Sequence, residues 1–276
     1  MNYLYNIVPG MFGLMVRWAE SQTDKTAYYV IFISALVLTA AAGYLLGSLN
    51  SAIIVSKTLF RKDIRQFGSG NAGLTNMFRV YGKKGALLTL LGDVLKQVVS
   101  VFLGIIIAGQ TGAYIAGLFC MIGHIFPVYY GFKGGKGVLT AATMILIIDP
   151  VIFLVLIVVF AVVLLFTQYV SLASIIAAIT YPAAVFYAAR IRTGNSPSIY
   201  SMLFALFVGL IVIFMHRSNI FRIFNNEESK FSFRSKPQAQ DILDAEDREN
   251  DKANEYVPEI RKKKKVRKGK YSSRKK

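Results

Sequence analysis

Seven long apolar runs, each nearly free of charged residues, follow one another along the chain. They cover approximately residues 28–48, 85–108, 112–130, 137–148, 151–167, 170–189 and 198–215. A helix of about 20 apolar residues crosses a hydrocarbon core of about 30 Å, so each run is a candidate transmembrane helix, the fourth being the shortest. Asp149 and Pro150 mark a tight turn after it. The pattern predicts an all-α integral membrane protein with about seven transmembrane helices.

Composition and charge extend this prediction to orientation. The chain has 276 residues, is 54% hydrophobic and yet carries a formal net charge of +17, so apolar and basic residues are segregated. Lysine and arginine collect in 49–84, in the loop before the fourth run, and after residue 215, whereas Arg190 and Arg192 are exceptions. Because cytoplasmic loops retain positive charge, we expect the N-terminus outside and the C-terminus in the cytoplasm.

Residues 1–27 form an N-terminal extension before the predicted core at 28–232. No basic region leads it, and Arg17, Glu20 and Asp24 interrupt any apolar stretch, which is not the pattern of a signal peptide. An interfacial helix is the alternative.

Residues 233–276 are strongly charged and lack apolar periodicity, which predicts a disordered cytoplasmic tail. Its last segment, RKKKKVRKGK, would be attracted to anionic lipid headgroups, and RNA would attract it too. A solvated tail without a specific partner fits the composition equally well.

Cysteine and histidine usage limits the chemistry. The single cysteine, Cys120, falls inside the third run, so no internal disulfide is expected and we assign it to packing. Cysteine, histidine and carboxylate residues do not cluster at metal-ligand spacing. We therefore expect chemistry without a bound metal or other cofactor.

The stretch GSGNAGLTN at 68–76 is unusually polar. Its glycines satisfy G-x-G-x-x-G, but a dinucleotide fingerprint needs a strand before it in an α/β unit, and Asp93, the candidate ribose-binding acid, lies inside an apolar run. A Walker A loop fails as well, because Lys136 in GFKGGKG is followed by Gly137 rather than by serine or threonine. Glycines can still let backbone N–H groups converge on an anion. The loop is thus a candidate phosphate site, or its glycines serve only tight turns.

Two further clusters fall on the same predicted side of the membrane. In GHIFPVYYGFKGGKG, 123–137, three glycines surround Lys136 where the fourth run begins, and a helix N-terminus with a lysine can bind an anion. The other cluster, HRSNIFRI at 216–223, directly follows the seventh run.

These segments carry a family resemblance. GSGNAGLTNMFRVYGKKG, GHIFPVYYGFKGGKGV and HRSNIFRI resemble, in order, the three cytoplasmic motifs of the bacterial membrane-bound acyl-phosphate:glycerol-3-phosphate acyltransferases. The resemblance implies transfer of a fatty acyl group from acyl phosphate to the 1-hydroxyl of sn-glycerol 3-phosphate. The products would be 1-acylglycerol 3-phosphate (lysophosphatidate) and phosphate, in phospholipid synthesis. It also implies a multi-pass protein of the bacterial plasma membrane with a cytoplasmic active site, membrane lipids around it and no obligate protein partner.

Carried over by position, the resemblance implies catalytic roles for Ser69, Arg79, Lys136, His216 and Asn219. Guanidinium geometry suits Arg79 to bidentate phosphate binding. Lys136, with the amides of Gly135 and Gly137, would neutralise the acyl phosphate and support the departing phosphate. His216 is a candidate general base, although we favour proton acceptance by the substrate's own phosphate, with His216 positioning glycerol 3-phosphate. The expected substrate-binding set is Gly68, Gly70, Asn71, Thr75, Asn76, Gly134, Gly135 and Gly137.

Asp93 and Lys96 form an i, i+3 pair inside the second run, where charges rarely occur without a partner or a task. We expect a buried ion pair that orients the first loop, and a structural hydrogen bond from His124.

Three positions depart from the family pattern. Asn50 replaces a proline, which predicts a softer helix break, and Gln97 stands where glycine usually follows the lysine of the second run. Asn226 stands where glycine is common but can also adopt the left-handed conformation.

Other functions fit less well. The H-x-x-x-x-D pattern of acyl-CoA-dependent acyltransferases is absent, since Tyr129 and Phe221 occupy the fifth positions after the two histidines. A transporter or channel for a phosphorylated solute fits the spans loosely, but repeat-related halves are not evident. A membrane scaffold that recruits RNA or anionic lipid through its tail would lose function on deletion of 233–276, whereas an acyltransferase would not.

Overall fold

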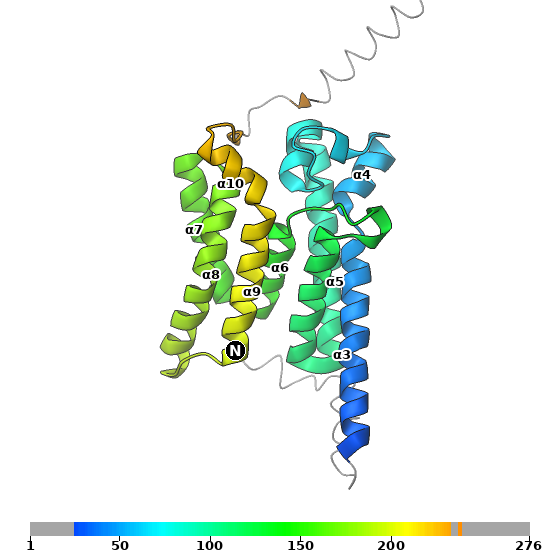
Figure 1. Ribbon diagram of the computed structural model, residues 1–276, viewed down its shortest axis with the longest axis vertical. Helices are drawn as coiled ribbons and strands as arrows, with labels where there is room; N and C mark the ends of the chain where they lie inside the picture. The colour runs from blue at the N-terminus through cyan, green and yellow to red at the C-terminus, as the bar shows by residue number, and fades with distance from the viewer. Residues whose placement is uncertain (1–24, 233–236, 239–276) are drawn as a thin grey trace, which may run out of the picture.

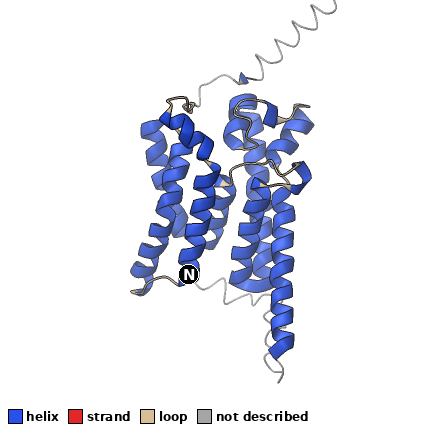
Figure 2. Ribbon diagram, viewed as in Figure 1, coloured by secondary structure: helices blue, strands red, loops and turns tan. Residues whose placement is uncertain are grey.

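The described part of the protein is an all-helical bundle. The computed structural model describes residues 25–232 and 237–238, within which helices are the regular elements and strands are absent (Figure 2). Residues 1–24 of the predicted extension lie outside the described residues, and so does the predicted tail apart from 237–238. The elements are α3 (Lys25–Ser48), α4 (Ser51–Leu59), η1 (Ile64–Gln66), α5 (Leu74–Ile125), η2 (Val128–Tyr130), α6 (Val138–Ile148), α7 (Pro150–Thr167), α8 (Val170–Thr193), α9 (Ile199–Met215) and α10 (Arg217–Phe224).

Four helical segments of the described chain are long and apolar enough to cross a membrane. A fifth is added if α9 and α10, which meet at a bend of 56°, count as one span, and α6 is a shorter apolar helix. Large apolar side chains such as Leu165, Phe166 and Leu210 are exposed on the outside, as expected for helices that face lipid. The four segments are Tyr29–Leu59, Leu74–Tyr130, Pro150–Thr167 and Val170–Thr193.

Helix α5 bends back on itself, which separates the second and third apolar runs of the sequence. The break lies at Ala108 and Gly109, where the backbone leaves helical geometry and Gly109 has φ of 58°. On the two sides of the break, the Ser100 hydroxyl donates to the Ala116 carbonyl at 3.0 Å. The two halves therefore run antiparallel, and both ends of α5 lie at one end of the bundle.

Small residues allow this close packing. A Cβ atom on Gly104 or on Gly112 would collide with the backbone of the other, and α3 approaches the second half of α5 in the same way, with Gly47 against the backbone of Cys120. Such contacts between glycines and backbone are typical of helices packed in a membrane. Cys120 is buried at this contact, as predicted.

The helices form two groups joined through α6. Figure 1 shows α3, α4 and α5 on one side and α7, α8 and α9 on the other, with α6 between them. One buried apolar cluster contains residues of α5, α6, α7, α8 and α9, and a second one contains residues of α4, η1 and the start of α5. The N-terminal end of α3 lies at the opposite end of the molecule from α10 (Figure 1).

Three sequence details can be placed in the structure. Asn50 lies between α3 and α4, where its Oδ1 accepts from the Ile53 N–H at 3.1 Å and caps α4, while α3 and α4 together form one candidate span; a softer break than a proline would give stays a prediction. Asn226 adopts the expected left-handed conformation, with φ of 57°. Arg192, one of the two exceptions to the charge pattern, forms an ion pair with Asp149 at 2.6 Å.

Candidate active site

The three motif segments converge on one cavity of about 680 Å³. All five predicted catalytic residues line it: Ser69, Arg79, Lys136, His216 and Asn219. From the predicted substrate-binding set, Gly68, Asn71, Thr75, Asn76 and Gly137 line the same cavity, and Gly70 lines an adjoining hollow. Gly134 and Gly135 line neither.

The first loop is held together by a single amide side chain. Asn76 lies on the first turn of α5, where it is buried, and its Oδ1 accepts from the Ser69 N–H at 2.9 Å. Its Nδ2 donates to the carbonyls of Phe67 and Asn71, both at 3.0 Å. The structure therefore gives Asn76 a role in shaping the loop that presents Ser69, and direct contact with a substrate phosphate stays a prediction.

The second loop ends at the N-terminus of α6. Gly137 is the N-cap with φ of 80°, and no side chain caps the helix there. The first N–H groups of α6 are thus directed toward the cavity end of the helix, where an anion would be stabilised.

The prediction for the Gly135 amide needs correction. Its N–H donates to the His124 carbonyl at 3.1 Å, and the Gly134 N–H donates to the Ile125 carbonyl at 3.1 Å. These pairings tie the loop back to the end of α5, so the amide of Gly135 is already used and the donors near Lys136 come from the start of α6.

Arg65 joins the first loop to the second. Its Nη1 donates to the Tyr130 carbonyl at 2.7 Å and to the Lys133 carbonyl at 3.3 Å. Asp63 holds the other side of the guanidinium in an ion pair at 2.8 Å, and this hydrogen-bonded arginine keeps the pKa of Asp63 well below its usual range. The two glycine-rich loops are therefore fixed relative to each other.

His216 lies at the bend between α9 and α10 and is buried. Its Nδ1 lies 2.7 Å from the Val212 carbonyl. A carbonyl oxygen only accepts, so Nδ1 carries the proton and Nε2 of the neutral ring is left as an acceptor. The arrangement suits His216 to accept a hydrogen bond from a substrate hydroxyl.

Lys136 belongs to a chain of polar contacts that crosses the cavity. Its ammonium contacts Oδ1 of Asn219, whose Nδ2 donates to Glu228 at 2.7 Å. Burial lowers the pKa of Lys136 to about 8, Glu228 opposes this effect, and the positive charges of Arg222 and Arg79 add to it. The cavity therefore gathers three basic side chains at one end.

Glu228 closes this chain. It accepts from the Ser171 hydroxyl at 2.6 Å and from Nε of Arg222 at 2.8 Å. Burial alone would raise the pKa of Glu228, but these hydrogen bonds together with that from Asn219 lower it below the usual value. Sequence reasoning missed Glu228, Arg222 and Ser171, although Arg222 belongs to the third motif; Glu228 stands among many charged residues that give no pattern.

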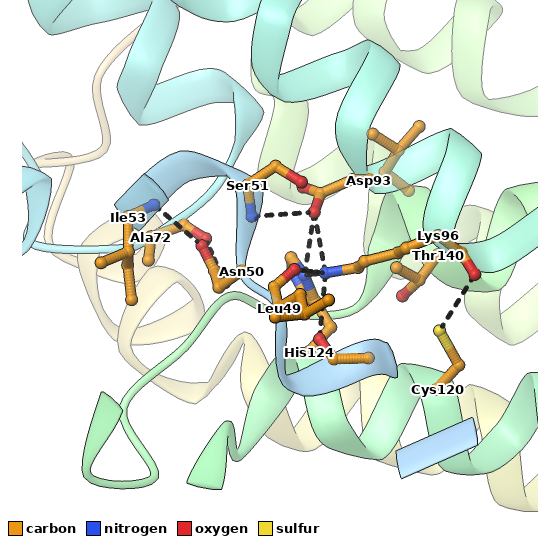
Figure 3. A network of polar contacts seen from close by, with 12 residues as sticks. Leu49, Asn50, Ser51, Ile53, Ala72, Asp93, Lys96, Cys120, His124 and Thr140 are labelled. Carbon is orange, nitrogen blue, oxygen red and sulfur yellow. Dashed lines mark hydrogen bonds and ion pairs between the residues drawn. The ribbon is translucent and has the colours of Figure 1, made fainter. Parts of the chain in front are cut away.

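A second polar network joins the junction of α3 and α4 to α5 (Figure 3). Lys96 pairs with Asp93 at 2.8 Å, which confirms the predicted buried ion pair. The same ammonium donates to the carbonyls of Gly47 and Leu49, so it fixes the end of α3, while Asp93 accepts from the Ser51 N–H at 3.4 Å. The pair therefore holds the junction of α3 and α4, and Asn50 in that junction reaches the first loop through the Ala72 carbonyl at 3.3 Å.

The remainder of the cavity is apolar. From Lys136 and His216 it extends between α6, α7, α8 and α9, with Ala141, Leu156 and Tyr181 among its walls. One compartment thus combines a basic, hydrogen-bonding end with a hydrophobic arm. Within the described residues, no group of three or more histidine, cysteine or acidic side chains is placed to hold a metal ion.

Comparison with known proteins agrees with this arrangement. A family model described as glycerol-3-phosphate acyltransferase matches residues 37–226, which include all three motif segments. The glycerol-3-phosphate acyltransferase of Finegoldia magna is 40% identical over 195 residues, covering 71% of this chain and 96% of that protein. That of Staphylococcus saprophyticus is 41% identical over 207 residues, covering 72% and 98%.

Two solved structures share the fold. Both are of PlsY (YgiH), described as an integral membrane glycerol 3-phosphate acyltransferase. The glycerol 3-phosphate form matches with a TM-score of 0.63 and 33% identity, covering 71% of this chain and 96% of that one. The lysophosphatidic acid form matches with a TM-score of 0.61 and 32% identity, covering 72% and 96%.

Proposed function

The chain belongs to the glycerol-3-phosphate acyltransferase family, and from this premise we propose that it transfers a fatty acyl group from acyl phosphate to the 1-hydroxyl of sn-glycerol 3-phosphate. The products are 1-acylglycerol 3-phosphate and inorganic phosphate. The observation that carries the proposal is the single cavity in which Lys136, Arg79 and His216 meet an apolar arm. A phosphorylated, water-soluble acceptor and a fatty acyl donor require both environments in one site.

Lys136 and the N-terminus of α6 form the proposed site for the phosphate of the donor. The ammonium and the uncapped N–H groups lie at the same loop, next to the mouth of the apolar arm. Such donors stabilise the negative charge that develops on the departing phosphate. The acyl chain then extends along α6 toward Leu156 and Tyr181.

Arg79, Ser69 and Asn219 form the proposed site for glycerol 3-phosphate. Arg79 lies on the second turn of α5, beside the loop that presents Ser69, and both line the cavity. The acceptor Nε2 of His216 is suited to hold the 1-hydroxyl. His216 then orients the nucleophile, and the phosphate of the acyl phosphate accepts the proton as the carbon–oxygen bond forms.

We also propose the membrane arrangement expected from the sequence. Counting both halves of α5 and the short α6, the chain crosses the membrane seven times through α3, α5 (twice), α6, α7, α8 and α9. Basic residues at the α10 end, including Lys57, Lys133 and Arg217, support the proposal that this end and the active site face the cytoplasm of a bacterial cell. The N-terminus is then outside.

The test is phosphate release from palmitoyl phosphate by the purified protein in detergent, with and without glycerol 3-phosphate. Release should depend on glycerol 3-phosphate and fall by at least 10²-fold in Lys136→Ala, since loss of one charge-stabilising donor typically costs 10²–10³ in rate. Arg190→Ala, at the far end of the bundle, is the matched control and should turn over like the wild type.

Product identification completes the test. Acylation at the 1-hydroxyl predicts lysophosphatidate in amounts equal to the phosphate released. A folded wild-type protein that binds glycerol 3-phosphate but makes no lysophosphatidate from palmitoyl phosphate would contradict the donor assignment. Turnover with palmitoyl-CoA in its place would identify a different donor.

A further inference from the structure

We propose that His124 is a positioning residue of the acyl-transfer site, whose imidazole supports the backbone of Gly135 and thereby fixes the adjacent Lys136. The inference rests on the function proposed above, since it assigns Lys136 to the donor phosphate. His124 lines the cavity and is 4% exposed. It lies on the last turn of α5, beside Lys96 and Asp93 (Figure 3).

The two ring nitrogens of His124 face different partners. Nδ1 lies 2.9 Å from Nζ of Lys96 and 3.5 Å from Oδ1 of Asp93. The lysine ammonium is held at 2.8 Å from Asp93 and also donates to the carbonyls of Gly47 and Leu49. An ammonium only donates, so the close contact makes Nδ1 the acceptor and leaves the ring proton on Nε2.

Nε2 is directed at the second loop. A Cβ atom built on Gly135 would collide with Nε2 of His124, and Cε1 of the same ring would lie 2.9 Å from it. The Gly135 N–H, in turn, donates to the His124 carbonyl at 3.1 Å. The side chain and the backbone of His124 thus contact the same glycine from two directions.

The two contacts to Gly135 restrict the backbone of Lys136, because Lys136 is the next residue in the chain. Gly137, directly after it, is fixed as the N-cap of α6 with φ of 80°. Lys136 is therefore held between a glycine supported by His124 and a glycine that begins a helix. Lys96 and Asp93 contribute indirectly: they fix the orientation of the His124 imidazole without contacting the second loop themselves.

Two substitutions of His124 distinguish a positioning role from a role in packing alone. In His124→Asn the side chain keeps a polar atom close to Lys96 but is too short to reach Gly135, whereas His124→Gln reaches further. We expect kcat/KM for acyl phosphate to fall by 10-fold to 100-fold in His124→Asn, as is usual when a reacting group is misplaced by about 1 Å. His124→Gln should recover at least a third of wild-type activity, and KM for glycerol 3-phosphate should change less than 2-fold in both.

Hydrogen exchange gives a readout that does not require turnover. Exchange of the amides in 131–137 should accelerate about 10-fold in His124→Asn and stay at the wild-type rate in Cys120→Ala, a matched control one turn earlier on α5. A wild-type protein inactive with acyl phosphate would refute the donor assignment, yet the exchange data would still decide the role of His124.

A double-mutant cycle tests the contact itself. Gly135→Ala should cost less activity in the His124→Asn background than in the wild type, because the shorter side chain removes the collision with the imidazole. The contact of the added methyl group with the Ala72 carbonyl, at 2.8 Å, is the same in both backgrounds. Strictly additive effects would overturn the proposal. So would wild-type kinetics in His124→Asn, unchanged loop exchange, or failure of His124→Gln to restore activity in a protein of unchanged Tm.

Discussion

Lys136 and Asn219 contact each other across the cavity although 83 positions separate them in the sequence. One comes from the loop before α6 and the other from α10, so the contact joins the second motif to the third. Asn219 accepts from Lys136 through Oδ1 and donates to Glu228 through Nδ2, which fixes the orientation of its amide. The contact explains why two separate motifs act as one site.

Lys136 gives the reaction a basic limb in its pH profile. Burial lowers its pKa to about 8, so the ammonium is charged below that pH and loses its proton above it. We expect kcat/KM for acyl phosphate to fall as pH rises through about 8, since kcat/KM reports the free enzyme. In Lys136→Arg the guanidinium stays charged, so the remaining activity should show no such limb. If kcat/KM of Lys136→Arg also fell near pH 8, the titrating group would be another residue.

Glu228 links α8 to α10 through hydrogen bonds to Ser171, Asn219 and Arg222. Glu228→Ala removes three hydrogen bonds and leaves Arg222 without its carboxylate. Breaking a largely buried, charge-assisted network costs about 2–4 kcal/mol, so the Tm of the detergent-solubilised protein should fall by several degrees. Glu227→Ala, an exposed neighbour, is the control and should leave Tm unchanged. Equal Tm values for the two variants would contradict this role.

Under the proposed function, the width of the apolar arm should limit the length of the acyl chain that the site accepts. Ala142 lines the cavity on α6, close to the second loop. Ala142→Phe should narrow the arm and lower kcat/KM for palmitoyl phosphate by about 10-fold or more, whereas an eight-carbon acyl phosphate should lose less, because each buried methylene is worth about 0.8 kcal/mol. Competition between palmitoyl phosphate and the eight-carbon acyl phosphate measures the ratio of their kcat/KM values directly. An equal loss for both would place the acyl chain elsewhere.

The hairpin in α5 depends on close approach of its two halves. Gly104→Ala places a methyl group against the Gly112 carbonyl and should lower the free energy of unfolding by about 1–3 kcal/mol. Gly109→Ala is the comparison: its positive φ is strained, but no atom lies within 4 Å of the added methyl, so the cost should be near 1 kcal/mol. Unfolding in detergent and denaturant gives both values. A larger loss at Gly109 would show that the turn, not the packing, limits stability.

The sequence predicted the helices well where composition alone decides them. The ends of α3, α7 and α9 fall within a few residues of the apolar runs at 28–48, 151–167 and 198–215. The predicted third run, 112–130, extends past the end of α5 at Ile125. The helix ends there because Pro127 follows, and a proline ring cannot continue a helix. The predicted loop at 49–84 contains α4 and the start of α5, since these short helices are too polar to register as spans.

The site was predicted in its members and less well in its contacts. Ser69, Lys136 and His216 meet as expected because motif recognition identifies residues independently of their partners. The use of the Gly135 amide was wrong because its partner, the His124 carbonyl, is a backbone atom with no sequence signature. Glu228 was overlooked for a similar reason, since one acid among many gives no pattern.

The charged pair on α5 restricts the order in which the protein enters its membrane. An isolated Asp93 or Lys96 at the centre of a helix would oppose insertion by about 2.5–3.5 kcal/mol each on translocon scales. Lys96 obtains two of its acceptors, the carbonyls of Gly47 and Leu49, from the end of α3 and the junction that follows it. Because α3 is synthesised before α5, the carbonyls of Gly47 and Leu49 are already present when Lys96 enters the membrane. We therefore expect α3, α4 and the first half of α5 to pack together in the bilayer while the rest of the chain is still being translated.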